Sequence, residues 1–243
     1  MGNKERKRRK RQYEKSFYQK GPKKGQEKEP IPEGQEKEPI PEWDNNLLSE
    51  EYFKQLELLH TIRPNSFGTS SHIRIFKKWI DMYEVKTFID YGCGKGYLVN
   101  TINDLYPNSC IGYDPAIEQW SELPKGKKEM LICTDVLEHI EPDYLVNVLK
   151  NIDSLFTKVA YLSIATCPAS KSLPDGRNAH LIQEEPEWWK QTLLENINAK
   201  IIHEEDKIRA TKERIRMIND SPTKILSIPN NKYIVVVEKN NEW

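Results

Sequence analysis

The chain has only four cysteines among its 243 residues, and no two of them form a CxxC pair. This spacing excludes a zinc knuckle and a disulfide framework, so we expect reduced thiols in a reducing compartment. The sequence also lacks an apolar segment behind its basic N-terminus and any apolar run of about 18 residues. We therefore expect no transmembrane segment and an intracellular location, cytoplasmic or, in a eukaryotic cell, nuclear because of the basic block.

A net charge is absent as well, but the neutral total conceals two oppositely charged parts. Residues 1–24 hold eleven Lys or Arg against two Glu, a net charge of +9, so the remaining 219 residues carry −9. Such a block can contact nucleic acid or an anionic membrane, and the aromatic residues among its charges favour nucleic acid through residues 4–24. A solvated tail that folds back on the acidic body is the alternative.

Two copies of the nonapeptide GQEKEPIPE follow the tail, at 25–33 and 34–42. Pro, Glu, Lys and Gln at this density cannot form a core, and two copies are too few for a solenoid. The sequence therefore predicts a basic disordered tail (1–24), a Pro/Glu-rich linker (25–42) and one folded domain (43–243). It leaves the oligomeric state open.

The folded domain is organised around the segment FIDYGCGKG at residues 88–96. A short apolar run that breaks into spaced glycines predicts a buried strand that turns tightly into a helix near Tyr97. Glycine permits positive φ and a close ligand approach, and the N-terminal N–H groups of the helix face that ligand. The GxGxxG spacing of NAD(P)-binding folds is missing, although a Rossmann-like NAD(P) binder stays an alternative.

Two further apolar runs end in carboxylates. The run IGYD ends at Asp114, where an acid at a strand tip either caps the strand or accepts hydrogen bonds from both hydroxyls of a ribose. The run MLICTD ends at Asp135 and leads into VLEHI. Taken in order, DYGCGKG, GYD and TDVLEHI resemble the motifs of the class I S-adenosylmethionine-dependent methyltransferases, across roughly residues 70–240.

This resemblance implies a doubly wound, Rossmann-like α/β sheet whose last strand, YIVVVEK at 233–239, is antiparallel. It also implies S-adenosylmethionine as the cofactor, with the methionine part at residues 90–96, the ribose at Asp114 and the sulfonium close to residues 135 and 136. The cofactor-binding residues that it implies are Asp90, Gly92, Cys93, Gly94, Gly96, Asp114, Pro115, Asp135 and Val136.

The segment after Asp114 departs from the family pattern. Only fifteen residues (115–129) separate the second apolar run from the third, too few for the helix and strand that a typical member places there. We therefore expect a shortened or missing third strand, with adenine recognised by loop residues such as Ile117 or Trp120.

Two other segments predict helices, and a third predicts a loop near the glycine segment. The run at 47–60 predicts a helix with Ser49 as its N-cap, and the charged stretch at 205–219 predicts another before the last strand. Between the first of these helices and the glycine segment, Phe67, Gly68 and Thr69 either line the cofactor pocket or belong to a simple capping loop.

His180 is the candidate general base. It lies in a long loop, about residues 167–183, after a predicted strand at 158–166, where related O-methyltransferases present substrate groups. The ordinary pKa of a histidine, about 6.5, suits proton removal at neutral pH. A plain surface histidine is the alternative.

The segment Asp135-Val-Leu-Glu138-His139 allows a metal site. It resembles the acid-x-x-Glu-His motif with which some ubiquinone-pathway and small-RNA 2′-O-methyltransferases bind a divalent metal, helped by a later histidine. Mixed carboxylate and imidazole ligands, here Glu138 and His139, would suit Mg²⁺ or Mn²⁺. Many metal-free members share DVLEH, so capping and packing of the turn stays the alternative.

The sequence thus predicts an enzyme that moves a methyl group from S-adenosylmethionine to an oxygen or nitrogen of a small molecule, sugar or lipid precursor. The Asp/Asn-Pro-Pro-aromatic motif of amino-methylating DNA enzymes is missing, and Cys167-Pro168 reverses the Pro-Cys of cytosine-C5 enzymes. Two alternatives stay open: an RNA (2′-O or end) methyltransferase guided by the basic tail, and a noncatalytic cofactor-binding module.

Overall fold

The computed structural model describes residues 46–62, 68, 72–208, 213–218, 221–226 and 231–240. The predicted boundaries of the basic tail and the linker, at residues 24 and 42, lie outside these residues. Among the described helices, none is long and apolar enough to cross a membrane.

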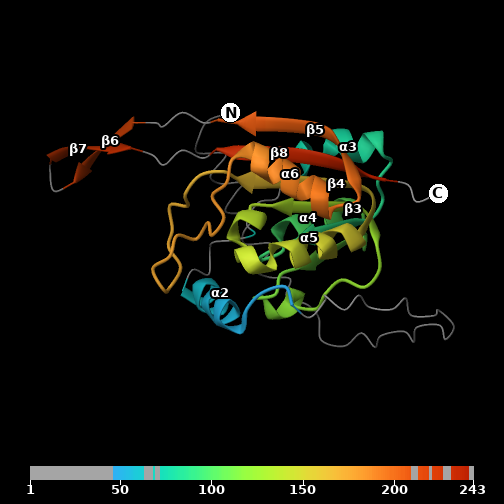
Figure 1. The fold of residues 1–243 in the computed structure, drawn as a ribbon, viewed down its shortest axis with the longest axis horizontal. Helices are drawn as coiled ribbons and strands as arrows, with labels where there is room; N and C mark the ends of the chain where they lie inside the picture. The colour runs from blue at the N-terminus through green and yellow to red at the C-terminus, as the bar shows by residue number, and fades with distance from the viewer. Residues whose placement is uncertain are drawn as a thin grey trace. The chain divides into compact units, whose positions relative to one another are not determined.

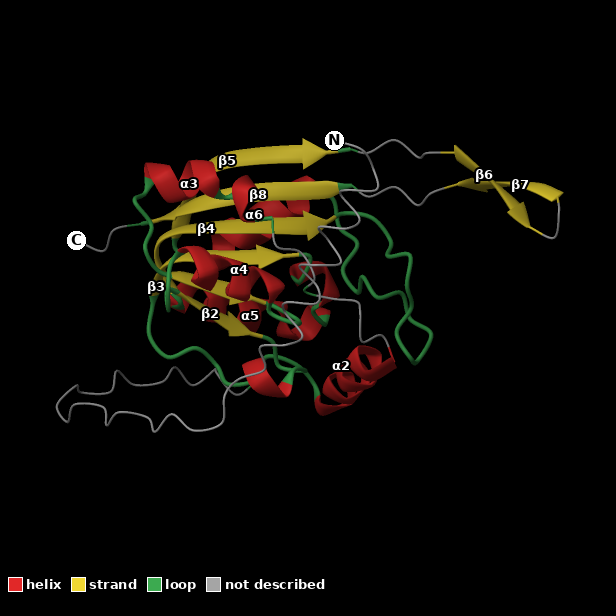
Figure 2. Cartoon of the chain, turned by 180° about the vertical axis from the view of Figure 1, so that it is seen from behind, coloured by secondary structure: helices red, strands yellow, loops and turns green. Residues whose placement is uncertain are grey.

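Six strands form one sheet in the order β2-β1-β3-β4-β8-β5 (Figures 1 and 2). The strands are β1 (Phe88–Tyr91), β2 (Cys110–Tyr113), β3 (Lys128–Thr134), β4 (Phe156–Ala165), β5 (Ala199–Lys207) and β8 (Lys232–Lys239). The first four in the sheet order are parallel, whereas β8 is antiparallel to both β4 and β5. The predicted sheet with an antiparallel last strand is therefore confirmed.

Helices cover both faces of this sheet. They are α3 (Lys77–Met82), α4 (Tyr97–Leu105), α5 (Leu145–Ser154) and α6 (Pro186–Asn196). Side chains of α3 and α4 form one core with Phe88 and Ile132, while α5 and α6 form another with Ile89 and Leu131. Because successive strand residues point to opposite faces, the strands supply both cores, which explains their continuous apolar runs.

The strand order reverses at β1, which has β2 on one side and β3 on the other. In an open α/β sheet, ligands bind in the crevice beyond the carboxyl ends of the strands at such a switch point. The three strands end at Tyr91, Tyr113 and Thr134. Asp114 and Asp135 directly follow two of these ends, so the fold places them at this crevice.

The third strand of the family pattern is missing, as predicted. The segment between β2 and β3 is fully described, and it holds only the 3₁₀ helix η2 (Glu118–Trp120). As a result β2 is an edge strand of the sheet.

The helix predicted at 205–219 is wrong. Strand β5 continues to Lys207, and β6 (Glu213–Ile218) pairs antiparallel with β7 (Ser221–Leu226) in a separate two-stranded sheet. The sequence RIRMI alternates charged and apolar residues with period two, which favours a strand, and the high charge of the stretch masked that alternation.

Candidate active site

The glycine turn between β1 and α4 forms one wall of the candidate site. Gly92 has a φ of +74°, in the left-handed region that glycine favours. A Cβ atom on Gly92 would lie 2.2 Å from Cγ2 of Val136, so only glycine lets the turn pack this closely against the segment after β3. The turn and that segment therefore meet directly at the switch point.

Gly68, from the chain ahead of α3, lies directly on the glycine turn. Its carbonyl accepts the N–H of Tyr97 at the start of α4, at 3.3 Å. A Cβ atom on Gly68 would lie 2.1 Å from the carbonyl oxygen of Cys93. Gly68 also lines the cavity described below. Phe67 and Thr69 lie outside the described residues.

Asp114, at the tip of β2, is hydrogen-bonded to the glycine turn. Its Oδ2 accepts the N–H of Gly94 at 2.9 Å, and its Oδ1 accepts the N–H of Ala116 at 3.1 Å. Burial raises the pKa of this carboxyl, while the nearby His60 imidazole opposes the shift. The two predicted halves of the cofactor site, turn and acid, are thus parts of one hydrogen-bonded unit.

A cavity of about 850 Å³ is lined both by the glycine turn and by the loop that carries His180. This volume lies in the upper part of the range, about 300–1,000 Å³, that is typical of small-molecule sites. The predicted cofactor-binding residues that line it are Gly92, Gly94, Asp114, Pro115, Asp135 and Val136. The cavity also contains Glu138, His139 and His180, so it brings the predicted cofactor, metal and catalytic residues together.

Three predicted cofactor-binding residues do not line this cavity. Asp90 and Cys93 are buried, with 5% and 2% of their surfaces exposed. Gly96 is covered by Trp120, because a Cβ atom there would lie 2.7 Å from the indole ring. Trp120 and Ile117, the loop residues predicted to recognise adenine, are also not among the lining residues, whereas Pro115 is.

The buried Asp90 carboxyl makes stability depend on pH. Burial, with a contribution from Asp114, raises the pKa of Asp90 to about 7. Because the folded-state pKa is above the unfolded one, this group's contribution is present at low pH and is lost as pH rises through about 7. We expect Asp90→Asn to raise the free energy of unfolding at pH 8.5 by about 2–4 kcal/mol and to change it little at pH 4.

Urea unfolding of the ligand-free protein at the two pH values tests this effect. The control is Asp104→Asn, because Asp104 is exposed on α4. An Asp90→Asn protein with the same stability difference at both pH values would contradict the assignment of the effect to ionisation.

Helix α2 (Glu50–Ile62) covers the cavity and was missing from the predicted site. Its Tyr52, Leu56, Leu59 and His60 all line the cavity. Their spacing of i, i+4, i+7 and i+8 places them on one face of the helix. Ser49 caps the helix as predicted, since its Oγ accepts the N–H of Tyr52 at 3.0 Å. In the sequence, only this mixed polar and apolar stripe indicates that the helix could line a site.

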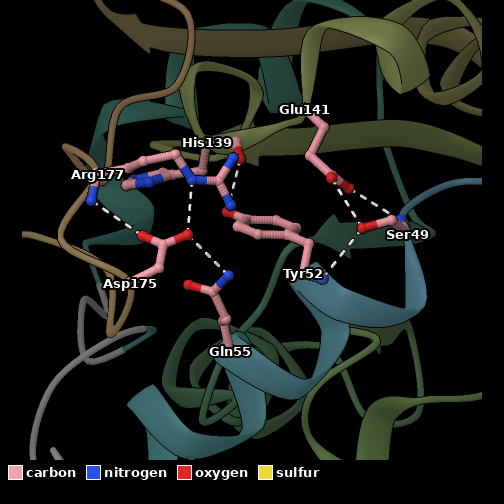
Figure 3. Close-up of polar contacts among 7 residues, drawn as sticks. All are labelled: Ser49, Tyr52, Gln55, His139, Glu141, Asp175 and Arg177. Carbon is pink, nitrogen blue, oxygen red and sulfur yellow. Dashed lines mark hydrogen bonds and ion pairs between the residues drawn. The ribbon is translucent and has the colours of Figure 1, made fainter.

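Three polar contacts hold α2 over the cavity (Figure 3). Ser49 donates from its N–H and its Oγ to the Glu141 carboxylate, both at 2.8 Å. Tyr52 donates its hydroxyl to the carbonyl of His139 at 2.6 Å. Gln55 donates to Asp175 at 2.8 Å. The helix is thereby attached to both the segment after β3 and the loop after β4.

Glu138, His139 and His180 form a cluster inside the cavity. One ligand atom of each residue lies within 4.8 Å of the others. The two imidazole rings meet edge to face with their centroids 4.8 Å apart. Although 41 positions separate the two histidines in the sequence, the long loop returns His180 to the 3₁₀ helix η3 (Leu137–His139).

Backbone carbonyls fix the two histidine rings. Nδ1 of His139 lies 2.6 Å from the carbonyl of Ala179, and Nδ1 of His180 lies 2.5 Å from the carbonyl of Cys167. A carbonyl can only accept, so each Nδ1 carries the hydrogen, and Nε2 is the nitrogen that keeps a lone pair when the ring is neutral. Burial, together with the His180 ring, lowers the pKa of His139 to about 4, so this ring is neutral at pH 7.

Glu138 is fully buried, with 0% of its surface exposed. Neither of its carboxylate oxygens has a hydrogen-bond partner of good geometry among the described residues, although the backbone N–H groups of Glu138 and Ala165 lie near enough to lower its pKa. Burial, and next the Asp135 carboxylate, raise the pKa of Glu138 to about 8. An unpaired buried carboxylate is costly, and a bound cation would stabilise its charged form. This donor set, one carboxylate and two imidazole nitrogens, fits a divalent transition metal such as Mn²⁺.

Asp135 has a different partner. Both of its carboxylate oxygens lie 2.6 Å from Nζ of Lys232, the first residue of β8. The backbone of Asp135 has a φ of +57°, rare for a residue with a side chain. Lys232 therefore already neutralises the acid at the first position of the motif, and no sequence pattern predicts this pair.

A doubly wound sheet with an antiparallel last strand, a glycine turn after the first strand and an acid after the second is the arrangement of the class I S-adenosylmethionine-dependent methyltransferases. The chain belongs to the methyltransferase-domain family, whose model matches residues 52–208. It is therefore an S-adenosylmethionine-dependent enzyme. Comparison with curated protein sequences gives no match.

Several solved structures are similar to the chain. One is magnesium protoporphyrin IX methyltransferase from Synechocystis PCC 6803 with bound S-adenosylhomocysteine, at 15% identity over 79% of this chain and 95% of that chain (TM-score 0.47). Another is a methyltransferase from Archaeoglobus fulgidus, at 17% over 78% and 100% (TM-score 0.46). A third is 1,6-didemethyltoxoflavin-N1-methyltransferase from Burkholderia thailandensis, at 10% over 79% and 90% (TM-score 0.47). The acceptors of these proteins do not identify the acceptor of this chain.

Proposed function

We propose that this methyltransferase acts on an oxygen of a small molecule, sugar or lipid precursor, and that a divalent cation at Glu138, His139 and His180 takes part. The observation that carries this proposal is the cluster itself. A buried carboxylate without a hydrogen-bond partner faces two histidines whose Nδ1 atoms are tied to carbonyls, inside the cavity that contains Asp114.

The size of the cavity and the helix that borders it favour a small acceptor. Apolar side chains of α2 and of the loop after β4 pack together beside the cavity as a separate cluster that includes Tyr52, Leu59, Leu173 and Ala179. An acceptor that binds in the cavity shares its volume of about 850 Å³ with the cofactor. A small molecule meets this condition more easily than an internal position of a folded nucleic acid.

Different residues of the chain would bind different parts of the cofactor. Asp114 would accept hydrogen bonds from the ribose hydroxyls, and the glycine turn would hold the methionine part. When bound, the cofactor supplies a methyl group that its sulfonium charge already activates. The chain then has to align the acceptor for in-line attack, exclude water and remove a proton.

The metal hypothesis and the general-base hypothesis for His180 require the same nitrogen. With Nδ1 on the Cys167 carbonyl, only Nε2 can bind a cation or take a proton. The nearness of Glu138 and His139 favours the cation. A cation held there would lower the pKa of an acceptor hydroxyl bound to it, which favours methylation of oxygen.

Transfer of a labelled methyl group tests the proposal. The full chain is incubated with methyl-tritiated S-adenosylmethionine and, separately, with a small-molecule extract and with total RNA. We expect label in a small-molecule product, lost in EDTA, restored by Mn²⁺ and unchanged after deletion of residues 1–42. Label in RNA alone, lost with residues 1–42, would contradict the proposal in favour of the tail-guided RNA enzyme. Transfer that persists in EDTA would contradict the metal and leave His180 as the base.

Asn178 gives a prediction for the loop that carries His180. Its Oδ1 accepts the N–H groups of Ala169 and His180, both at 2.9 Å, and its Nδ2 donates to the Ala169 carbonyl at 2.9 Å. We expect Asn178→Ala to weaken Mn²⁺ binding about tenfold, because the loop loses the contacts that place His180. Mn²⁺ titration measures the effect.

Asn178→Asp is the matched variant, because an aspartate keeps both accepting contacts, whereas the donor to the Ala169 carbonyl becomes a charged oxygen that repels it. We expect an intermediate loss of Mn²⁺ affinity. Wild-type affinity in Asn178→Ala would contradict a positioning role for this side chain.

A further inference from the structure

We propose that the Tyr52 hydroxyl is a positioning group that couples cofactor binding to metal binding through α2. The inference rests on the proposed metal site, because it concerns the carbonyl of a proposed ligand, His139. Nothing in the methyltransferase motifs assigns a role to this tyrosine, which precedes the glycine segment by about forty residues.

Helix α2 spans the cavity from one site to the other. Tyr52 and His60 lie on the same face of the helix and both line the cavity. Eight residues of α-helix rise by about 12 Å, so the two side chains lie at separated points along one stiff element. A shift of the helix therefore moves both contacts together.

At the cofactor end, His60 of α2 lines the same cavity as Asp114, the proposed ribose acid. The electrostatic interaction between the two groups raises the pKa of His60 and lowers that of Asp114, against the larger effect of burial on each. Leu59 is buried and lines the cavity beside His60. A cofactor whose ribose is bound at Asp114 would contact this end of α2 and stabilise its docked position.

At the metal end, the Tyr52 hydroxyl joins α2 to the cluster. Only 2% of the surface of Tyr52 is exposed, and its hydroxyl donates to the His139 carbonyl at 2.6 Å. The ring of the same histidine is held by Ala179 from the other side. Figure 3 shows the Tyr52 hydroxyl beside His139, while Ser49 and Gln55 bind acids outside the cluster. Tyr52 is thus the contact through which the docked helix fixes a proposed ligand.

Two ligands that both favour the docked position of α2 bind cooperatively, and the coupling is reciprocal. S-adenosylhomocysteine should raise the affinity for the cation by the same factor by which the cation raises the affinity for S-adenosylhomocysteine. Loss of the Tyr52 hydroxyl should remove this mutual increase in affinity, while the side chains that bind the cofactor and those that bind the cation are unchanged.

The experiment measures both affinities in the full chain. S-adenosylhomocysteine is titrated by calorimetry in EDTA and again with saturating Mn²⁺, and Mn²⁺ is titrated by electron paramagnetic resonance with and without S-adenosylhomocysteine. We expect each ligand to tighten the other at least about fivefold in the wild type. In Tyr52→Phe we expect this factor to fall to about one, with an altered Mn²⁺ spectrum because the His139 backbone is released.

Two control variants separate the hydroxyl from general docking of the helix. Gln55→Ala removes the contact with Asp175, and Ser49→Ala removes both the side-chain contact with Glu141 and the cap on the N–H of Tyr52 while keeping the Tyr52 hydroxyl. Both should keep most of the coupling. If Ser49→Ala abolishes the coupling as fully as Tyr52→Phe does, or if Tyr52→Phe keeps the wild-type factor, the role of the hydroxyl is overturned.

The wild type alone distinguishes failure of the inference from failure of the metal site. Binding of S-adenosylhomocysteine without any Mn²⁺ binding would overturn the metal site and, with it, the inference. Independent binding of both ligands would overturn only the inference.

Discussion

Asp114→Ala is expected to weaken the binding of S-adenosylhomocysteine by at least about 100-fold. A hydrogen bond to a charged group contributes about 1.5–3 kcal/mol, and a ribose offers two hydroxyls to this carboxylate. The substitution also frees the N–H groups of Gly94 and Ala116, which Asp114 holds at 2.9 and 3.1 Å. Calorimetric titration measures the loss.

The matched variants are Asp114→Asn and Asp104→Ala. Asparagine keeps the size and one accepting oxygen, so we expect a smaller loss of affinity than with alanine. Asp104 is exposed on α4, and its removal should leave the affinity unchanged. Equal affinities for wild type and Asp114→Ala would show that the ribose binds elsewhere.

Glu138→Gln is expected to weaken Mn²⁺ binding by at least about 100-fold, since it replaces a charged ligand with a neutral one of the same shape. Removal of residues that only support metal ligands already costs about 10–100-fold. The substitution also removes a buried carboxyl whose oxygens have no partner among the described residues. We therefore expect the free energy of unfolding of the metal-free protein to stay the same or to rise.

Mn²⁺ titration and urea unfolding together check this prediction. The control is Glu187→Gln, an exposed carboxyl on α6. In EDTA, Glu138→Gln should bind S-adenosylhomocysteine as the wild type does, because the predicted ribose acid is intact. Undiminished Mn²⁺ binding would mean that Glu138 is a buried structural acid and that the metal lies elsewhere.

The parts of the site that follow strand ends could be predicted from the sequence. The glycine turn, Asp114 and Asp135 each continue a buried parallel strand, and the carboxyl ends of such strands meet at one edge of the sheet. The missing third strand was also predictable, because the number of residues between β2 and β3 limits what they can form. The apolar pattern of each strand and the length of the segment between two strands were sufficient to predict these features.

The contacts made across long sequence distances could not be predicted. The approach of His180 to His139 depends on how a long loop folds back, and the pairing of Lys232 with Asp135 depends on where β8 begins. The docking of α2 depends on single hydrogen bonds, such as that from Tyr52 to His139, that leave no periodic signal. In β6 charged and apolar residues partly alternate, as in a strand, but the high charge of the stretch at 205–219 favours the prediction of a helix.

Calorimetric titration of the intact chain with S-adenosylhomocysteine, first in EDTA and then with Mn²⁺, tests the shared cofactor and metal cavity most directly. We expect binding of one molecule per chain in EDTA and tighter binding with Mn²⁺. Absence of binding under both conditions would contradict the cofactor site at Asp114 and the glycine turn, and with it the function built on that site.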